Sequence, residues 1–351
     1  MGDPLRVGLI GYGYWGPNLA RNMYQLRDAE LAAVADVDDK RLEEPARLYH
    51  ARTYTDYRAL LADPQLDAVV VATPARTHFE ITRQALERGK HVLVEKPLAM
   101  SSPEARELIA LAERVHRVLM VGHTFEYNAA VWKIRELIEA GAIGDVYYVY
   151  ANRVNLGRVQ RDINALWSIA PHDISILLHV LGDMPIEVSA RGATFLNEHV
   201  EDVVFVTLTF PKNILAHVHA SWLDPLKLRR MTFVGSTKMI VYDDVDAEAK
   251  LRIYDKGVYR RGSDFGEPQL KVHSGDIFIP RIDLSEPLHN ECAHFIECVR
   301  ESKPPRTDGA SGLRVIQVLE AAQESLARNG IPVAVGRMKV ADLATSSEAE
   351  G

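Results

Sequence analysis

Hydrophobic residues follow two different patterns along the chain, and the pattern changes near Gly122. Before this residue, short apolar runs alternate with stretches of helical periodicity. The runs predict strands at residues 7–10, 31–35, 68–72, 91–94 and 118–121. The helical stretches lie near residues 17–26, 40–48, 55–62, 77–88 and 102–116. Strands that alternate with helices predict a parallel sheet with helices on both faces.

Beyond Gly122, strand-like runs follow one another with few helices between them. They lie at residues 146–152, 186–195, 202–211, 214–222, 229–235 and 238–242. Helices are predicted near residues 128–140, 167–181, 287–301 and 309–328. Consecutive strands predict a mostly antiparallel sheet within an α+β domain. The segment 255–286 is rich in Gly, Pro and charged residues and is predicted to be a loop.

The change of pattern divides the 351 residues, which exceed the usual length of one domain, into three parts. Residues 1–122 are expected to form an α/β domain, and residues 123–337 an α+β domain with a large open sheet. Residues 338–351 are predicted to be a disordered tail. Helices cover one face of an open sheet and a second subunit often covers the other, so a homodimer or homotetramer is expected.

Composition limits the kinds of partner that the protein can have. Hydrophobic residues make up 47% and charged residues 25%, as in an ordinary globular protein. A formal net charge of −7, without a Lys/Arg-rich block, argues against a nucleic-acid partner. The sequence has no secretory leader and no uninterrupted apolar run of about eighteen residues. No membrane partner is therefore expected, and a cytoplasmic location is predicted.

The two cysteines predict neither a disulfide nor a metal site. Cys292 and Cys298 lie in one predicted helix and are six residues apart. This spacing turns them about 240° around the helix axis, so they face different directions. Since Cys and His residues also show no spacing typical of metal ligands, no metal is expected.

A glycine fingerprint follows the first predicted strand and opens the first helix. Its residues are Gly11, Tyr12, Gly13, Tyr14, Trp15 and Gly16. The first glycine permits a tight turn, the second lets the backbone approach a pyrophosphate, and the third lets helix and strand pack closely. The N–H groups at the helix start then face the pyrophosphate. Asp36 ends the second strand, where a carboxylate accepts hydrogen bonds from an adenosine ribose.

The residues around Asp36 favour NAD over NADP as the cofactor. A carboxylate at this position repels the 2′-phosphate of NADP. Residues 37–39 offer no arginine to hold that phosphate, and Lys40 and Arg41 are expected on the next helix.

Polar residues follow the third and fourth core strands, at the sheet edge where open α/β sheets bind ligands. These candidate cofactor-binding residues are Thr73, Pro74, His78, Glu95 and Lys96. A lysine directly after a buried strand lies over the crevice rather than on a solvated helix face. Partial burial there would lower its pKa and suit it to proton transfer or to polarising a substrate hydroxyl. The alternative is a surface lysine beside a loop proline.

The order of these motifs resembles the glucose–fructose oxidoreductase / inositol dehydrogenase / MocA family. The resemblance is carried by residues 11–16, Asp36, Thr73-Pro74 with His78, Glu95-Lys96-Pro97, residues 122–128, Pro171-His172-Asp173-Ile174 and residues 305–309. It spans nearly the whole chain. It implies an N-terminal Rossmann domain and a C-terminal domain whose large open sheet often forms the oligomer contact. It also implies a nicotinamide cofactor and a polyhydroxylated, sugar-like substrate.

The resemblance also implies roles for individual residues. Lys96 matches the family's active-site lysine, and Pro97 matches the proline that orients it, usually through a cis peptide. His172 matches the histidine that acts as acid or base on the carbon whose hydride moves. Many relatives have an aspartate four residues before this histidine, where this chain has Ser168. The expected catalytic residues are therefore Lys96 and His172, whereas three further histidines are expected to be structural or cofactor-adjacent: His78, His123 and His179.

Substrate contacts are expected near the helix that carries His172. The candidates are Tyr127, Asn128, Arg153, Asn155 and Ser168. Amide and guanidinium groups suit hydroxyls, a carboxylate or a phosphate, although a plain surface loop explains the Arg153 segment about as well. Residues 164–174 resemble the family branch that oxidises nucleotide-linked sugars at C3. The first hypothesis is therefore an NAD(P)-dependent nucleotide-sugar 3-dehydrogenase.

Other functions stay open beside this one. The same residues suit a ketoreductase that acts on a nucleotide deoxysugar, or a dehydrogenase of free sugars or inositol. An NAD-dependent glycosidase would release an aglycone without net NADH. A non-catalytic NAD-binding regulator would bind the cofactor without turnover, but the presence of Lys96 and His172 favours an enzyme.

Overall fold

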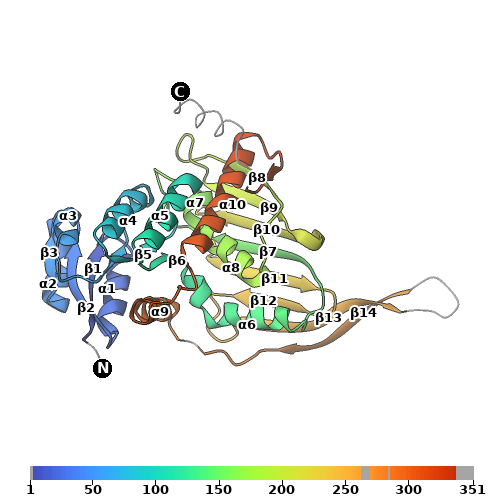
Figure 1. The fold of residues 1–351 in the computed structure, drawn as a ribbon. Helices are drawn as coiled ribbons and strands as arrows, with labels where there is room; N and C mark the ends of the chain where they lie inside the picture. Colours follow the sequence, from blue (N-terminus) through green and yellow to red (C-terminus); the bar gives the residue numbers. More distant parts are fainter. Residues whose placement is uncertain (1–2, 262–268, 284, 337–351) are drawn as a thin grey trace.

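The computed structural model describes residues 3–261, 269–283 and 285–336. Figure 1 shows two lobes side by side, the smaller formed by the first strands and helices and the larger built on a broad sheet. The predicted fold class, a Rossmann α/β unit followed by an α+β unit with an open sheet, is confirmed. The predicted tail, residues 338–351, lies outside the described residues.

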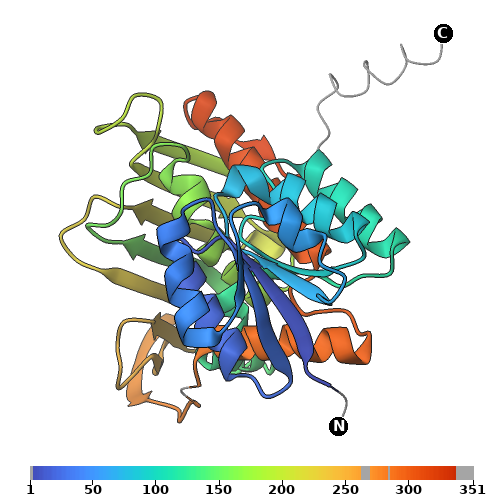
Figure 2. The same cartoon turned by 90° about the vertical axis from the view of Figure 1, so that its left-hand side faces the viewer.

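Six parallel strands form the first sheet in the order β3-β2-β1-β4-β5-β6. Their bounds are β1 Leu5–Ile10, β2 Ala29–Ala35, β3 Arg52–Tyr54, β4 Ala68–Val71, β5 His91–Glu95 and β6 Leu119–Gly122. The central strands are almost entirely apolar because helices cover both faces of the sheet, as Figure 2 shows. The strand order changes direction between β1 and β4, and the carboxyl ends of these strands therefore open a crevice.

The helices of the first lobe lie where the sequence predicts them. Their bounds are α1 Gly16–Gln25, α2 Asp39–Tyr49, α3 Tyr57–Leu61, the short η1 Ala75–Thr77, α4 His78–Glu87 and α5 Ser102–Arg114. The predicted strands at 7–10, 31–35, 68–72, 91–94 and 118–121 are confirmed to within a few residues. β3 was missed because its three residues are partly exposed and form no apolar run.

Nine strands form the second sheet, in the order β14-β13-β12-β11-β7-β10-β9-β8-β15. Their bounds are β7 Val146–Val154, β8 Glu187–Ala193, β9 Val203–Thr209, β10 Leu215–Ser221, β11 Leu228–Gly235, β12 Met239–Asp243, β13 Leu251–Arg261, β14 Gln269–Phe278 and β15 Val333–Ala334. The pairing of β10 with β7 is parallel, whereas the other pairings are antiparallel. The prediction of a mostly antiparallel sheet is therefore confirmed.

The prediction that residues 255–286 form a loop is wrong for most of the described part of this segment. β13 and β14 pair as a hairpin that extends from the body of the molecule (Figure 1). Gly257 was counted as a loop signal, but it allows close packing: a Cβ at this position would lie 2.7 Å from the carbonyl oxygen of Thr237. Exposed apolar residues such as Val258 and Val272 pair across the hairpin, and the many charges between them hid the alternation. Residues 262–268 and 284 lie outside the described part.

Helices cover one face of the second sheet. The covering helices are α6 Ala129–Glu139, α7 Ala165–Ile169, α8 Pro171–Leu181 and α10 Gly309–Ala327. The other helical segments are η2 Thr124–Tyr127, η3 Pro211–Asn213, which connects β9 and β10, and α9 Pro287–Glu301. The helix predicted at 167–181 is interrupted, because Pro171 begins α8 and has no N–H to continue the ladder of α7. α9 packs against α1 of the first lobe, so the chain returns to the Rossmann unit after the second sheet is complete.

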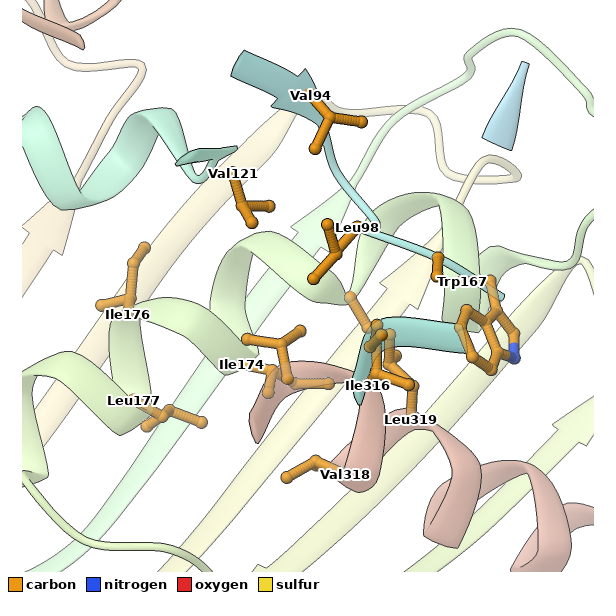
Figure 3. Packing of buried hydrophobic residues seen from close by; sticks show 14 of the residues in the cluster. Val94, Leu98, Val121, Trp167, Ile174, Ile176, Leu177, Ile316, Val318 and Leu319 are labelled. Atoms are coloured by element: carbon orange, nitrogen blue, oxygen red, sulfur yellow. The ribbon is translucent and has the colours of Figure 1, made fainter. Parts of the chain in front are cut away.

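One hydrophobic core joins the two lobes. Figure 3 shows Val94 and Val121, near the ends of β5 and β6, with Leu98 between them and the helices of the second lobe. Ile174 of α8 and Ile316 of α10 are fully buried in the same cluster. This packing fixes the end of β5 relative to α8.

The opposite face of the second sheet carries exposed aromatic and aliphatic side chains. They project from three adjacent strands, β7, β10 and β9, and include Tyr148, Tyr150, Phe205 and Leu215. The ring of Phe205 stacks on His219 with 4.4 Å between centroids. Within the described residues, no helix is long and apolar enough to cross a membrane.

Candidate active site

A cavity of about 1130 Å³ lies between the lobes, over the carboxyl ends of the parallel strands. At one end it is lined by the glycine loop and Asp36, and at the other by α7, α8 and the ends of β10 and β11. Lys96 and His172 both line it. One continuous space therefore connects the predicted dinucleotide site with the predicted catalytic residues.

Each glycine of the fingerprint is required for a different physical reason. Gly11 has φ +95°, and a Cβ there would lie 2.6 Å from the carbonyl oxygen of Ala72. A Cβ on Gly16 would lie 2.5 Å from the Gly11 carbonyl oxygen, so these two are required by close backbone packing. Gly13 faces the cavity, and the nearest atom to an added Cβ is the Arg41 guanidinium at 3.7 Å. This leaves open space above the loop, as a pyrophosphate requires.

The aromatic residues of the loop are divided between core and cavity. Tyr12 is buried, whereas Tyr14 and Trp15 are exposed and line the cavity. The polar group of Trp15 also acts on Glu95, whose pKa it lowers.

Asp36 is held firmly at the end of β2. Its carboxylate accepts the backbone N–H groups of Tyr12 at 2.7 Å and of Asp38 at 2.9 Å. Arg41 lies on α2, as expected, but its guanidinium reaches back to within 3.5 Å of Asp36. The sequence does not predict this contact, because the separation of five residues between Asp36 and Arg41 does not indicate where the arginine side chain points.

His78 links two of the strand-end loops. Its ring nitrogens lie 2.7 Å from the Pro97 carbonyl oxygen and 2.8 Å from the Thr73 carbonyl oxygen. The ring is buried, and burial lowers its pKa. Thr73 and Pro74 line the cavity beside it. His78 therefore links the Thr73 loop to the loop that carries Lys96, and it also lines the cavity where the cofactor is expected.

Lys96 extends from the end of β5 toward the helices of the second lobe. The peptide bond between Lys96 and Pro97 is cis. The Lys96 ammonium donates a hydrogen bond to the Ser168 carbonyl oxygen at 2.8 Å. Burial lowers the pKa of Lys96, and the neighbouring Glu95 carboxylate partly opposes this shift. The interruption between α7 and α8 thus places a backbone acceptor within reach of the Lys96 side chain.

His172 lies in the first turn of α8, with its ring edge against Phe125 at 5.1 Å between centroids. Its Nδ1 atom is buried and has no hydrogen-bond partner among the described residues. Burial lowers the pKa of His172 well below its usual value, and the charges of Lys96 and Arg153 lower it further. The imidazole is therefore neutral at neutral pH and can accept a proton or a hydrogen bond.

Arg153 does not offer a free charge to a substrate. It forms a buried two-point ion pair with Asp173, with N–O distances of 2.7 and 3.0 Å. Its guanidinium also covers the Phe125 ring at 4.3 Å. Arg153 also lines the cavity, so its expected contact with substrate stays a prediction.

The other substrate candidates are placed differently. Asn128, Asn155 and Ser168 line the cavity, although Asn128 also caps α6 through its side-chain oxygen. Tyr127 does not line this cavity: its hydroxyl bonds Thr307 at 3.0 Å in the core. The expectation that Tyr127 contacts substrate therefore has no geometric support, because η2 turns its side chain toward α9 and α10.

Several residues that line the cavity were not among the residues predicted to bind substrate or cofactor. They line the end near His172 and include Thr124, Phe125, Gln160, Trp222 and Arg229. Trp222 follows the end of β10 and Arg229 lies at the start of β11, and these two strands lie on either side of β7. Both cysteines are free, and within the described residues no group of His, Cys, Asp or Glu is arranged to hold a metal ion.

Comparison with known proteins gives the same family for both lobes. Residues 5–123 match the family described as "Oxidoreductase family, NAD-binding Rossmann fold", and residues 131–241 match "GFO/IDH/MocA C-terminal domain". The chain is 28% identical to UDP-N-acetylglucosamine 3-dehydrogenase of Acidithiobacillus ferrooxidans, over 89% of this chain and 94% of that protein. The solved structure of that enzyme superposes with a TM-score of 0.77 at 26% identity, covering 93% of this chain and 99% of the other.

A second relative acts on a different compound. Myo-inositol 2-dehydrogenase of Thermotoga maritima is 25% identical over 92% of this chain and 96% of its own length. A solved complex of levoglucosan dehydrogenase with NADH has the same fold, with a TM-score of 0.79, 22% identity and coverage of 96% of this chain and all of the other. The chain therefore belongs to the Gfo/Idh/MocA family and is an NAD-dependent oxidoreductase.

Proposed function

We propose that this enzyme transfers a hydride between nicotinamide and a secondary hydroxyl or ketone carbon of a sugar, with C3 of a nucleotide-linked sugar as the first candidate. The observation that carries the proposal is the convergence of Lys96 and His172 in a cavity that continues to the glycine loop. The similarity to UDP-N-acetylglucosamine 3-dehydrogenase over nearly the whole chain supports the nucleotide-linked substrate.

The residues of the first lobe fit the cofactor. The open space above Gly13 and the start of α1 suit the pyrophosphate, and the Asp36 carboxylate suits the adenosine ribose. Thr73, Pro74 and Glu95 would line the path toward the nicotinamide. When bound, NAD supplies the hydride acceptor of the oxidation, or NADH the donor of the reverse reaction.

Lys96 and His172 handle the proton of the substrate hydroxyl. In the oxidation, one of these two bases removes the hydroxyl proton as hydride leaves the same carbon. In the reduction, the same group protonates the forming alkoxide. Since Ser168 carries no charge, the proton transfer does not depend on an acidic partner four residues before His172.

A thermal-shift screen tests the substrate class directly. Purified protein with NAD is melted in the presence of UDP-, dTDP- and GDP-sugars and of free polyols, since a ligand of the native state raises its apparent stability. The proposal expects the largest shift, and NAD reduction, from a nucleotide sugar. If only free sugars or inositol raise the melting temperature and are turned over, the free-sugar or inositol dehydrogenase is supported instead. Oxidation of NADH with a keto sugar would support the ketoreductase.

Two alternative functions that are not simple dehydrogenases, a glycosidase and a regulator, predict different experimental results. Release of an aglycone without net NADH would support an NAD-dependent glycosidase. Binding of NAD without turnover of any sugar in a broad library would support a regulator. Lys96 and His172 are both retained at the cavity wall, which favours chemistry over sensing.

The assembly and the location of the protein are further parts of the proposal. We infer that a second copy covers the exposed face of β7, β9 and β10 to form a homodimer or homotetramer. Light scattering that gives one subunit mass at micromolar concentration would contradict this. A cytoplasmic location is also proposed, and cell fractionation tests it.

A further inference from the structure

One side of the catalytic cavity is formed by a segment without helix or strand, residues 155–163, which leads from β7 to α7. We call this segment the cavity loop. Its residues that line the cavity are Asn155, Arg158, Gln160, Asp162 and Ile163. Because the loop has no ladder of backbone hydrogen bonds of its own, its position depends on contacts with neighbouring elements. Those contacts therefore decide the shape of this side of the cavity.

The second lobe holds both ends of the cavity loop. Near its start, the Gly157 N–H donates to the Trp222 carbonyl oxygen at 3.1 Å. At its end, the Asn164 side-chain amide donates to the Glu201 carboxylate at 2.7 Å and to the Gln323 side-chain oxygen at 2.9 Å. The two ends are thus anchored to the sheet and to α10, and the middle of the loop needs a partner of its own.

That partner is an arginine of the first lobe. Arg76 belongs to η1, and its guanidinium donates to the Asp162 carbonyl oxygen at 3.1 Å and lies 3.5 Å from the Asp162 carboxylate. Among the hydrogen bonds and ion pairs of the described residues, those of Arg76 are the ones that join the cavity loop to the first lobe. The Asn197 amide, 3.5 Å from the Gln160 carbonyl oxygen, comes from the second lobe. Arg76 itself does not line the cavity, so it acts on the site through Asp162.

Arg76 projects from a turn that is fixed relative to the cofactor-binding loop. The Thr77 hydroxyl lies 2.8 Å from the Pro74 carbonyl oxygen and 2.7 Å from the Thr73 hydroxyl. The His78 ring holds the Thr73 carbonyl oxygen at 2.8 Å. Thr73 and Pro74 both line the cavity where the cofactor is expected. The position of the Arg76 guanidinium therefore follows that of the cofactor site.

On its other side, the contact leads to the catalytic lysine. Asp162 lies two residues before Asn164, whose side-chain oxygen accepts the Trp167 N–H at 3.1 Å and so caps the start of α7. The same short helix leads to Ser168, and the Ser168 carbonyl oxygen accepts the Lys96 ammonium at 2.8 Å. A shift of the cavity loop would therefore be felt at the acceptor of Lys96.

We propose that Arg76 is a positioning residue: its contact with Asp162 holds the cavity loop over the bound sugar, and so keeps the sugar of the second lobe against the nicotinamide of the first. The inference rests on the proposed function, in which both ligands share this cavity. Hydride transfer requires the two reacting carbons to be held close and aligned, although their binding residues belong to different lobes. The two charged side chains are 62% and 39% exposed, and such a contact is weak enough to break when ligands enter and leave.

Arg76→Ala is the central variant, because it removes both contacts with Asp162 and changes no residue that lines the cavity. Arg88→Ala is the matched control. Arg88 is another exposed arginine of the first lobe that donates to a backbone carbonyl, but its acceptor, Gln84 at 3.4 Å, lies in the adjacent helix α4. Both variants are expected to keep the melting temperature of the native protein, since exposed contacts of this kind contribute little to global stability.

The first measurement is cleavage of the cavity loop by trypsin, with NADH bound and no sugar present. Arg158 and Arg161 are exposed and are the trypsin sites within this loop. When the loop closes faster than trypsin cuts, the cleavage rate follows the population of the open form. Arg76→Ala is expected to be cut there about fivefold faster than the native protein, as loss of an exposed charged contact implies, and Arg88→Ala at the native rate. Equal cleavage in Arg76→Ala and the native protein would overturn the proposal.

The second measurement is turnover with the sugar found by the screen, UDP-N-acetylglucosamine being the first tried. Arg76→Ala is expected to raise KM for the sugar about fivefold and to change kcat by less than about twofold, because saturating sugar drives the loop closed. The dissociation constant for NADH should stay unchanged, and Arg76→Lys, which keeps the charge, should restore most of the native KM. A merely structural role would instead reduce the amount of active enzyme, which lowers kcat and leaves KM unchanged.

The outcomes separate this inference from the proposed function. If the native protein turns over a sugar and Arg76→Ala has the native KM, the role of Arg76 is wrong and the proposed function stands. If Lys96→Ala turns over normally, or no sugar is turned over at all, the proposed function fails. The trypsin experiment still decides in that case whether Arg76 holds the loop, because it requires no substrate.

Discussion

Burial lowers the pKa of both Lys96 and His172, and the charge of Lys96 lowers the pKa of His172 further. Both side chains are therefore available as neutral bases at a lower pH than in water. In the oxidation the base must be unprotonated, so the rate is expected to fall as the pH falls through the lowered pKa. Two bases beside one cavity leave open which of them accepts the proton first.

Alanine at either position is expected to lower kcat by about 100-fold or more, because each variant removes an acid–base group at the reacting carbon. The dissociation constant for NADH should change little, since the glycine loop and Asp36 lie at the other end of the cavity. Steady-state kinetics and fluorescence titration measure the two effects. Lys133→Ala, at a partly exposed lysine of α6 that pairs with Glu136 and does not line this cavity, is the control. Normal turnover in Lys96→Ala and His172→Ala would contradict the assignment.

The preference for NAD over NADP also depends on single residues, because Arg41 lies beside Asp36. Asp36→Ser removes the carboxylate that repels a 2′-phosphate and frees the Arg41 guanidinium, which lies 3.5 Å away. We expect NADH affinity to fall about tenfold and NADPH affinity to rise, because a charge-assisted contact to phosphate replaces the ribose contact. Competitive titration with the two reduced cofactors measures this. Asp39→Ser, at an exposed acid of α2, should leave the preference for NADH unchanged.

At the scale of elements, the packing of α10 against β6 connects the two lobes. A Cβ on Gly312 of α10 would lie 2.8 Å from the Val121 side chain and 3.2 Å from Leu98. Gly312→Ala is therefore expected to overpack this interface and to reduce the free energy of unfolding by about 1–3 kcal/mol. Chemical denaturation measures the loss. Ala310→Ser, at an exposed position of the same helix, should change stability much less, and equal stability of both variants would argue against a tight interface.

The parallel sheet could be predicted from the sequence because its buried strands are continuous apolar runs bounded by turn residues. β13 and β14 could not, since their alternation is masked by charges and by Gly257, whose role depends on the neighbouring Thr237 backbone. The break before α8 was also missed, although Pro171 was visible. The sequence did not predict these elements, because they depend on tertiary contacts rather than on a local pattern of residues.

In the candidate site, too, some residues could be predicted from local sequence and others depend on tertiary packing. Lys96 was indicated by its place directly after a predicted strand and His172 by the family resemblance, and the structure brings both to one cavity. The pairing of Arg153 with Asp173 and the inward orientation of Tyr127 depend on how η2 and α8 pack, so the sequence could not indicate them.

At the scale of the whole molecule, the cavity and the exposed sheet face lie on opposite sides of the second sheet. Helices and the Rossmann unit lie on one side of this sheet (Figures 1 and 2). The cavity is lined by residues of both lobes and therefore lies on that side. The other face exposes Tyr148, Tyr150 and Phe205 on neighbouring strands. Assembly and cofactor binding should therefore be separable by mutation.

Phe205→Glu tests this separation, because a carboxylate at the centre of the apolar face would be buried without a partner in any assembly that uses this face. The variant is expected to be a monomer by light scattering at concentrations at which the native protein is a dimer or tetramer. Its NADH affinity should be unchanged, since Phe205 lies across the sheet from the cavity. Leu48→Glu adds the same charge at an exposed leucine of α2 and should leave the assembly intact. If Phe205→Glu keeps the native mass, the subunits meet elsewhere, and the exposed hairpin of β13 and β14 becomes the next surface to examine.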